Sequence, residues 1–419
     1  MSVGARGTEG AVDERGNPFW TYDSPTGPLE ITINLAKPEK DPRDIAAADR
    51  SDVASCDLCW GASGEDGPAH LRRSGAPVTE VFLGDEPWAW WFSPYGYFPE
   101  HLIVASHEHR PMAIGHDTIA RLLDFSDAYP QWFIGSNADL PIVGGSLLSH
   151  DHFQGGSHRF PLMDAPIARA FAIEGLEGVK AGIVRWPASV VRLRSRDRSA
   201  LAEAACRVLD AWRPFSFEEC GIRAFSVLPA EGLDCGDAAT GEVRRENAAD
   251  PAGAEGTPGC FVQHNTANPI LWREGGDYVL DLVLRNNRTT AERPFGLFHV
   301  PERLFHIKKE NIGLIEVMGL FILPGRLKTE LKLLEAYLTG SKPMVRPEEG
   351  DPSYKHWDWL EDIVARRGLC TDEAQAEQVL REEVAAVCAQ VLADAGVYKQ
   401  DEAGLAGMKR FLAMLGYQA

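Results

Sequence analysis

The sequence contains no long uninterrupted apolar run. Its most apolar stretch, residues 314–323, is broken by Glu316 and is followed by Pro324 and Gly325. A helix that crosses a bilayer needs about 20 consecutive apolar residues. Residues 1–17 are small, polar and glycine-rich, without the apolar core of a secretory signal peptide. We therefore predict a cytoplasmic protein that has no membrane partner.

Basic residues are also scarce. The 42 lysines and arginines are outnumbered by 61 aspartates and glutamates, which gives a formal net charge of -19. Binding to long nucleic acids needs a clustered basic face, so this charge balance argues against a nucleic-acid partner. It does not exclude a small phosphorylated substrate, because a few side chains or backbone N–H groups in a cleft can hold one phosphate.

Cysteines and the common nucleotide-binding motifs are sparse. Eight cysteines are spread unevenly over 419 residues, which is typical of reduced thiols in a cytosolic protein. The chain has no G-x-G-x-x-G after a strand and no G-x-x-x-x-G-K-[ST], so Rossmann and P-loop folds lose their main support. The length suggests two or three domain-sized units.

The pattern along the chain divides it into four regions. They are an N-terminal arm and strand (1–50), a catalytic lobe that holds almost all the candidate chemistry (51–200), a second mixed lobe (201–345) and a helical C-terminal region (346–419). Residues 29–34 alternate as in a strand, and apolar residues between 379 and 391 recur at helical spacing. Helices mixed with short alternating strands favour an α+β fold with antiparallel sheet.

Histidine and glycine concentrate in one segment, which reads LLSHDHFQGG from Leu147 onward. If its first eight residues form a strand, His150, His152 and Gln154 lie in line on one face. A neutral imidazole can attack phosphorus, and an amide can donate to a phosphate oxygen as charge develops. Flanking glycines such as Gly155 allow a ligand to approach the backbone. We predict a catalytic site; ordinary core or surface histidines are the alternative.

Cys56 and Cys59 form a C-x-x-C pair, which indicates metal or redox chemistry. No second such pair exists, so a tetrahedral zinc site would need histidines from elsewhere. His109 and His150 are the first candidates, and His107 could replace His109. We predict a structural Cys2His2 zinc site that braces the histidine segment. Two unrelated buried thiols are the alternative, and a redox dithiol is disfavoured because a thioredoxin-like βαβ pattern is missing.

Longer motifs around these residues resemble one protein family. The segment SNADLPIVGGSLLSHDHFQGG at 136–156 is similar to the signature of class II galactose-1-phosphate uridylyltransferases (UDP-glucose–hexose-1-phosphate uridylyltransferases). The similarity continues in LEITINLAKPEKDP at 29–42, WFSPYGY at 91–97, DLVLRNNR at 281–288 and HIKKENIGLIEVMGL at 306–320. The matching segments occur in order and cover roughly residues 28 to 330.

The resemblance implies a fold of the histidine triad superfamily, with two related lobes built on antiparallel half-barrel sheets and helices. It also implies an enzyme of galactose metabolism (the Leloir pathway). In that reaction His152 would take the uridylyl group from UDP-glucose and release glucose 1-phosphate. Galactose 1-phosphate would then collect the group in the second half of a ping-pong cycle.

The resemblance also implies roles for individual residues. The implied zinc ligands are Cys56, Cys59, His109 and His150. Asn137 and Gln154 are expected to contact the nucleotide phosphates, and the sugar-phosphate site is expected to include Lys308, Lys309 and Asn311. A basic turn carrying Lys37 and Lys40 would reach the substrate of a neighbouring subunit, as in a homodimer.

Two other functions are compatible with the same segment. A related superfamily enzyme could discharge the histidine adduct onto water or inorganic phosphate, as a nucleotide hydrolase or phosphorylase. A non-catalytic protein could bind a nucleotide sugar without reacting. The long match outside the histidine segment favours the transferase, and an intact nucleophile beside Gln154 argues against a purely binding role.

Overall fold

The computed structural model describes residues 12–13, 15–35, 56, 58–59, 77–145, 147–228, 243–244 and 260–416. Lys37 and Lys40, the two basic residues of the predicted substrate-binding turn, lie outside these residues. Among the helices within the described ranges, none combines the length and the apolar character that crossing a membrane requires.

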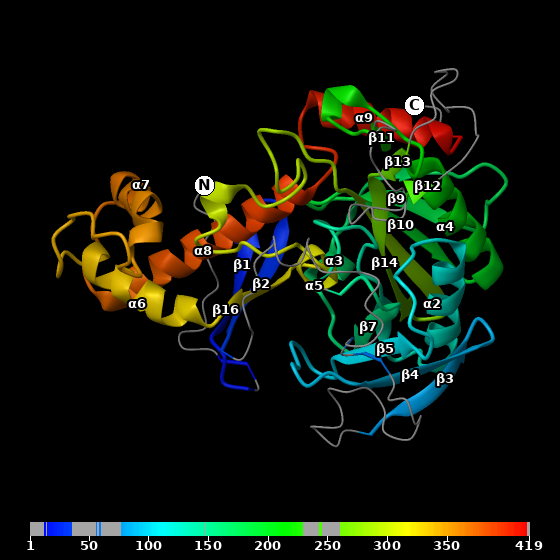
Figure 1. Ribbon diagram of the computed structural model, residues 1–419, viewed down its shortest axis with the longest axis horizontal. Helices are drawn as coiled ribbons and strands as arrows, with labels where there is room; N and C mark the ends of the chain where they lie inside the picture. The colour runs from blue at the N-terminus through cyan, green and yellow to red at the C-terminus, as the bar shows by residue number, and fades with distance from the viewer. Residues whose placement is uncertain are drawn as a thin grey trace.

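A ten-stranded antiparallel sheet forms the largest layer of the molecule (Figure 1). Its strands in spatial order are β3 (Thr79–Leu83), β4 (Glu86–Phe92), β5 (Leu102–Ser106), β7 (His152–Gly156), β6 (Phe133–Gly135), β14 (Asn265–Glu274), β15 (Asp277–Asn286), β10 (Val190–Ser195), β9 (Lys180–Val184) and β8 (Ile167–Phe171). The first five and the last five strands make two halves, which meet where β6 pairs with β14. β8, β9 and β10 thus belong to the second half although they precede residue 200.

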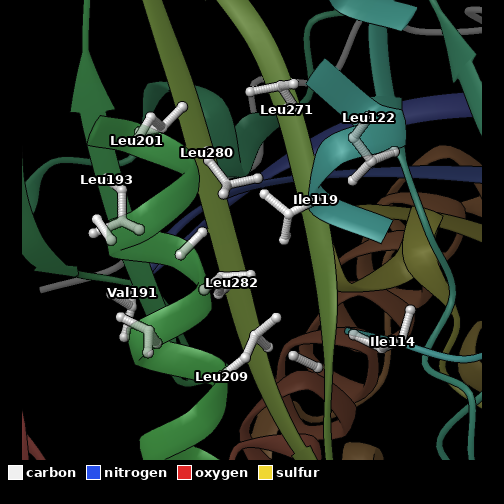
Figure 2. Packing of buried hydrophobic residues seen from close by; sticks show 14 of the residues in the cluster. Ile114, Ile119, Leu122, Val191, Leu193, Leu201, Leu209, Leu271, Leu280 and Leu282 are labelled. Atoms are coloured by element: carbon white, nitrogen blue, oxygen red, sulfur yellow. The ribbon is translucent and has the colours of Figure 1, made fainter. Parts of the chain in front are cut away.

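Two helices pack on one face of this sheet. They are α2 (His116–Ala128) and α4 (Arg198–Trp212). Figure 2 shows Leu201 and Leu209 of α4 beside Leu280 and Leu282 of β15, and Ile119 of α2 to their right, in one apolar cluster on this face. All five side chains are almost completely hidden from solvent. Burial of this apolar surface holds the two halves of the sheet in one layer.

A smaller sheet packs over the opposite face. It consists of β1 (Phe19–Ser24), β2 (Gly27–Asn34) and β16 (Leu320–Pro324), accompanied by the short helices α3 (Pro161–Asp164) and α5 (Leu314–Val317). β2 contains the strand predicted at 29–34, and it pairs antiparallel with β1 and parallel with β16. The apolar cluster on this side joins Ile31 and Phe321 to Ile270 and Val283 of the large sheet. The same cluster includes Ile307, Ile312 and Leu314, so it also holds segment 306–320 against the large sheet.

The C-terminal region is helical, as predicted. It contains α6 (Arg326–Leu338), α7 (Trp357–Arg367), α8 (Glu373–Ala395) and α9 (Glu402–Met414). In α8 the Asp372 carboxylate accepts a hydrogen bond from the Gln375 N–H at 2.8 Å and so begins the helix, and Gly396 ends it. In Figure 1, α8 runs from α6 and α7 toward β1 and β2.

The remaining described elements are short. They are the 3-10 turns η1 (Glu218–Cys220), η2 (Glu302–Leu304) and η3 (Tyr354–His356), and a small sheet of β11 (Phe225–Leu228), β13 (Cys260–Gln263) and β12 (Val243–Arg244). Helices together with a mainly antiparallel sheet confirm the predicted α+β class.

Candidate active site and metal centre

The catalytic candidates lie on β7, one strand away from the junction between the two halves of the sheet. His152 pairs with Ala105 of β5, and Gln154 pairs with Ile103 of β5 and Gly135 of β6. Residues two apart on a strand share a face, so the imidazole and the amide project from the same side. The structure therefore brings the predicted nucleophile and its predicted helper together.

The strand starts five residues later than the sequence predicted, because the preceding backbone bonds elsewhere. The Asp151 N–H donates to the Arg110 carbonyl oxygen at 2.7 Å, so this part of the chain follows the loop after β5. His150 consequently turns away from the line of His152 and Gln154. The prediction of a straight strand through all three residues was wrong.

His152 is held in one tautomer. Its side chain is buried, and Nδ1 lies 2.8 Å from the carbonyl oxygen of His150. A carbonyl oxygen can only accept, so Nδ1 carries the proton and Nε2 carries the lone pair. Burial lowers the pKa of His152, which favours the neutral ring. A neutral imidazole with an unprotonated Nε2 is the form that can act as a nucleophile.

Two carboxamides among the predicted site residues are oriented through their oxygens. Gln154 Oε1 accepts a hydrogen bond from Nε2 of His101 at 3.0 Å. Asn137 Oδ1 accepts one from the Leu314 N–H at 2.8 Å. Because each oxygen faces a protein donor, each NH2 group points the other way. An NH2 group can donate to a phosphate oxygen, which a carbonyl oxygen cannot do.

The opposite face of β7 is anchored in the apolar core. Phe153 is 1% exposed, and its ring stacks on Trp88 with centroids 4.9 Å apart and planes 5° apart. Just before the strand, the Asp151 carboxylate lies 3.3 Å from Nε of Arg110, which also pairs with Glu86 at 2.5 Å. The stacking of Phe153 on Trp88 and the ion pair between Asp151 and Arg110 together fix the backbone that carries His152.

Four predicted metal ligands converge on one point. The donor atoms of Cys56, Cys59, His109 and His150 all lie within 4.8 Å of one another. Nδ1 of His109 is 2.9 Å from Cys59 Sγ, and Nδ1 of His150 is 3.6 and 3.7 Å from the two sulfurs. Donors around a tetrahedral zinc ion are about 3.3–3.8 Å apart, given bond lengths of about 2.0–2.3 Å. The cluster uses His109 rather than His107.

The surroundings of this cluster also suit a metal ion. His150 Nε2 donates to the Ser106 carbonyl oxygen at 2.8 Å, which leaves the Nδ1 lone pair directed at the cysteines. Burial raises the pKa of Cys59 to about 11, and the neighbouring Cys56 thiol contributes to this increase. A bound cation would reverse that preference and stabilise the thiolate. The residues present therefore form a Cys2His2 cluster that could bind a metal.

The predicted sugar-phosphate residues are divided in space. Asn311 donates to the Gly144 carbonyl oxygen at 3.4 Å, so it lies against the loop that carries Asn137. Lys308 is buried, and its Nζ donates to Glu316 at 2.9 Å and to Glu310 at 3.2 Å. Burial alone would lower the pKa of Lys308, but the two carboxylates raise it. A phosphate would have to displace a carboxylate to reach this ammonium group.

Gly155 and Lys309 complete the predicted set. A Cβ atom on Gly155 would lie 2.5 Å from the Phe133 carbonyl oxygen of the neighbouring strand. Close packing within the sheet therefore already requires glycine at this position. Lys309 is half-buried beside Lys308.

Sequence reasoning missed the residues that support the site from other segments. His101 contacts Gln154, and Arg110 contacts Asp151 on the chain between the two histidines. Neither belongs to a periodic pattern or to a motif of its own. The available signal was their position beside β5, since His101 directly precedes that strand and Arg110 follows it.

Comparison with solved structures and family models adds little. No protein-family model matches the chain. The solved structure of yeast Ap4A phosphorylase covers 75% of this chain and 81% of its own, at 10% identity and a TM-score of 0.37, which is too distant to support an argument.

Bacterial proteins named galactose-1-phosphate uridylyltransferase, in contrast, align along nearly the whole chain. The protein of Caldanaerobacter subterraneus subsp. tengcongensis is 42% identical over 409 residues, which cover 96% of this chain and 73% of that protein. The proteins of Halalkalibacterium halodurans and Bacillus subtilis are 46% and 43% identical, and this chain spans 73% and 72% of their lengths. The chain belongs to the galactose-1-phosphate uridylyltransferase family.

Proposed function

We propose that this protein transfers a uridylyl group from UDP-glucose to galactose 1-phosphate. In the first step, Nε2 of His152 attacks the α-phosphorus of UDP-glucose and forms a P–N bond. The P–O bond to glucose 1-phosphate breaks, and the leaving oxygen keeps the electron pair. In the second step, a phosphate oxygen of galactose 1-phosphate attacks the same phosphorus. The P–N bond breaks, its electron pair returns to Nε2 of His152, and UDP-galactose is released.

The hydrogen bond from His152 Nδ1 to the His150 carbonyl oxygen carries this proposal. It supplies the two properties that the first step needs, a lone pair on Nε2 and a fixed direction of attack. The step requires no proton transfer, because the attacking ring is neutral and the sugar phosphate leaves as an anion. A surface histidine with a freely rotating ring would lack both properties.

The amides of Gln154 and Asn137 are proposed to hold the nucleotide phosphates. Their oxygens accept hydrogen bonds from His101 and Leu314, so their NH2 groups are available to non-bridging phosphate oxygens. Hydrogen bonds that strengthen as charge develops on phosphorus lower the barrier. This role for Gln154 is catalytic because the amide would contact the reacting group.

The sugar-phosphate end of the substrate is proposed to face the loop where Asn311 meets Gly144. Lys309 and Lys308 belong to the same segment, and Lys308 would act there through Glu316 and Glu310 because it is paired with both. The basic residues Lys37 and Lys40 are proposed to act across a homodimer interface.

The Cys2His2 cluster is proposed to hold a structural zinc ion. All four candidate ligands are cysteine or histidine, which is typical of closed zinc sites without an open coordination position. Bound zinc would tie the Cys56–Cys59 turn to the start of β7, without a direct part in the chemistry.

An isotope-exchange assay tests the proposed reaction. The purified protein is incubated with UDP-glucose and labelled glucose 1-phosphate in the absence of galactose 1-phosphate. A ping-pong transferase moves the label into UDP-glucose while the amount of UDP-glucose stays constant. Net loss of UDP-glucose with release of UMP would instead indicate a hydrolase and would overturn the proposal.

Intact-protein mass spectrometry locates the intermediate. Addition of UDP-glucose should increase the protein mass by one uridylyl group, and proteolysis should place this group on the peptide that contains His152. Addition of galactose 1-phosphate should then remove it. A modification on any other residue would contradict the assignment of the nucleophile.

A further inference from the structure

Gln154 depends on one neighbouring imidazole for its orientation. Nε2 of His101 lies 3.0 Å from Oε1 of Gln154, and His101 is only 3% exposed. The two residues are 53 positions apart in the sequence and meet because β5 pairs with β7, with Ile103 opposite Gln154. The contact is therefore a product of the sheet and not of a local motif.

The environment of His101 determines which nitrogen carries its proton. The Tyr97 backbone N–H points at Nδ1 from 3.5 Å, so Nδ1 acts as the acceptor and Nε2 as the donor. Burial lowers the pKa of His101 to about 4, and the ring is therefore neutral at physiological pH. A neutral ring with its proton on Nε2 can only offer Gln154 a donor.

Two aromatic rings pack against His101 and restrict its rotation. The Tyr97 ring is stacked on it, with centroids 5.4 Å apart and planes 22° apart. Phe98 lies against it as well, with a centroid distance of 4.5 Å. Tyr97 is in turn stacked on Tyr95 at 5.8 Å. The donor therefore has a fixed direction, which a solvent-exposed histidine would not have.

We infer that His101 is a positioning residue that selects the reactive orientation of the Gln154 amide. A carboxamide can rotate by 180° and exchange its oxygen with its NH2 group at little cost when nothing distinguishes the two. The His101 N–H is a donor, so it favours only the orientation in which the Gln154 oxygen faces it. The NH2 group then faces the substrate phosphate. In the reversed orientation, an oxygen lone pair would face an anion.

This inference rests on the proposed function, because it gives Gln154 a role at the transferred phosphate. It goes beyond that function by assigning a task to a residue outside the histidine segment. It also predicts that the loss of His101 lowers kcat more than it weakens the binding of UDP-glucose. The amide is needed most when charge develops on the phosphate in the transition state.

Two substitutions separate the hydrogen bond from the packing. His101→Phe keeps an aromatic ring but removes the donor, and kcat should fall on the order of 10- to 100-fold with little change in KM. His101→Gln restores an N–H at about the same reach and should recover part of the rate. Phe160 is buried and packs edge-on against Phe98, one ring further from His101, so Phe160→Leu perturbs the same aromatic cluster and should leave kcat nearly unchanged.

A double-mutant cycle tests whether His101 acts through Gln154. If it does, the variant carrying both His101→Phe and Gln154→Ala should have the same kcat as Gln154→Ala alone, within about 2-fold. If the two losses multiply, His101 acts on its own and the inference is wrong. A loss of kcat in Phe160→Leu as large as that in His101→Phe would equally refute it.

A readout without catalysis distinguishes this inference from the proposed function. In protein with 15N-labelled histidine, His101 should give a slowly exchanging Nε2–H resonance that disappears in His101→Phe and shifts in Gln154→Ala. Its absence from the wild-type spectrum would overturn the hydrogen bond itself. If the resonance behaves as expected but no exchange of labelled glucose 1-phosphate occurs, only the proposed reaction fails.

Discussion

Replacing Phe153 with alanine tests the link between the core and β7, the strand that carries the candidate catalytic residues. Phe153 lies between His152 and Gln154 in the sequence, and it points to the opposite face. It is 1% exposed and stacks on Trp88 at 4.9 Å. Truncation of a buried phenylalanine costs about 3–5 kcal/mol, which includes the lost transfer energy and the cavity that remains. We expect Phe153→Ala to lower the free energy of unfolding by about this amount.

Urea denaturation followed by tryptophan fluorescence measures the effect, because Trp88 reports directly on the stacked ring. Phe82→Ala is the matched control: Phe82 belongs to the edge strand β3 and is 69% exposed, so its loss should change stability by less than about 0.5 kcal/mol. Equal effects of the two substitutions would refute the reasoning. Phe153 would then not be buried, and His152 and Gln154 could not share the opposite face.

Three further predictions concern other parts of the molecule. His152→Gly should lower the exchange rate by at least about 10⁴-fold and leave the circular dichroism spectrum unchanged, because it removes the proposed nucleophile and leaves the apolar core residues in place. Cys56→Ser should reduce bound zinc, measured by mass spectrometry, and lower the melting temperature; a metal-free and equally stable wild type would contradict this. His299 is fully buried, and burial lowers its pKa from 6.5 to about 4, so its contribution to stability is complete above pH 6.5 and is lost as the pH falls toward 4. The loss amounts to about 3 kcal/mol, and urea titrations of His299→Gln should show a weaker dependence on pH in this range.

The elements that could be predicted from the sequence are those with strong periodicity. Val379, Val384 and Val391 recur at helical spacing, and they form the buried face of α8. The alternating residues 29–34 lie within β2. In both cases the period of the side chains reports directly on which face is buried.

The start of β7 could not be predicted, because it depends on a distant partner. Residues 147–151 have the composition of a strand, but the Asp151 N–H bonds to Arg110 instead of to a neighbouring strand. The histidines in this segment were recognised because motif and chemistry agree. The bend that separates His150 from His152 leaves no trace in the local pattern.

Lys308 shows a second limit of reading a sequence. A run of charged residues such as KKEN is usually a solvated turn or an anion-binding site. Here Lys308 is buried and pairs with Glu310, two residues away, and with Glu316, in the first turn of α5. Packing of segment 306–320 between the two sheets, which no local property encodes, decides its environment.

His150 connects the Cys2His2 cluster to the proposed reaction. Its ring is directed at Cys56 and Cys59, while its own carbonyl oxygen accepts a hydrogen bond from Nδ1–H of His152, the proposed nucleophile. His150 thus takes part both in the Cys2His2 cluster and in the hydrogen bond that orients His152. Protein without the metal should still bind UDP-glucose but react slowly. A more mobile His150 would no longer hold the His152 ring in the orientation that directs Nε2 at the phosphorus. A bound metal would thus influence the orientation of His152 without contacting the substrate.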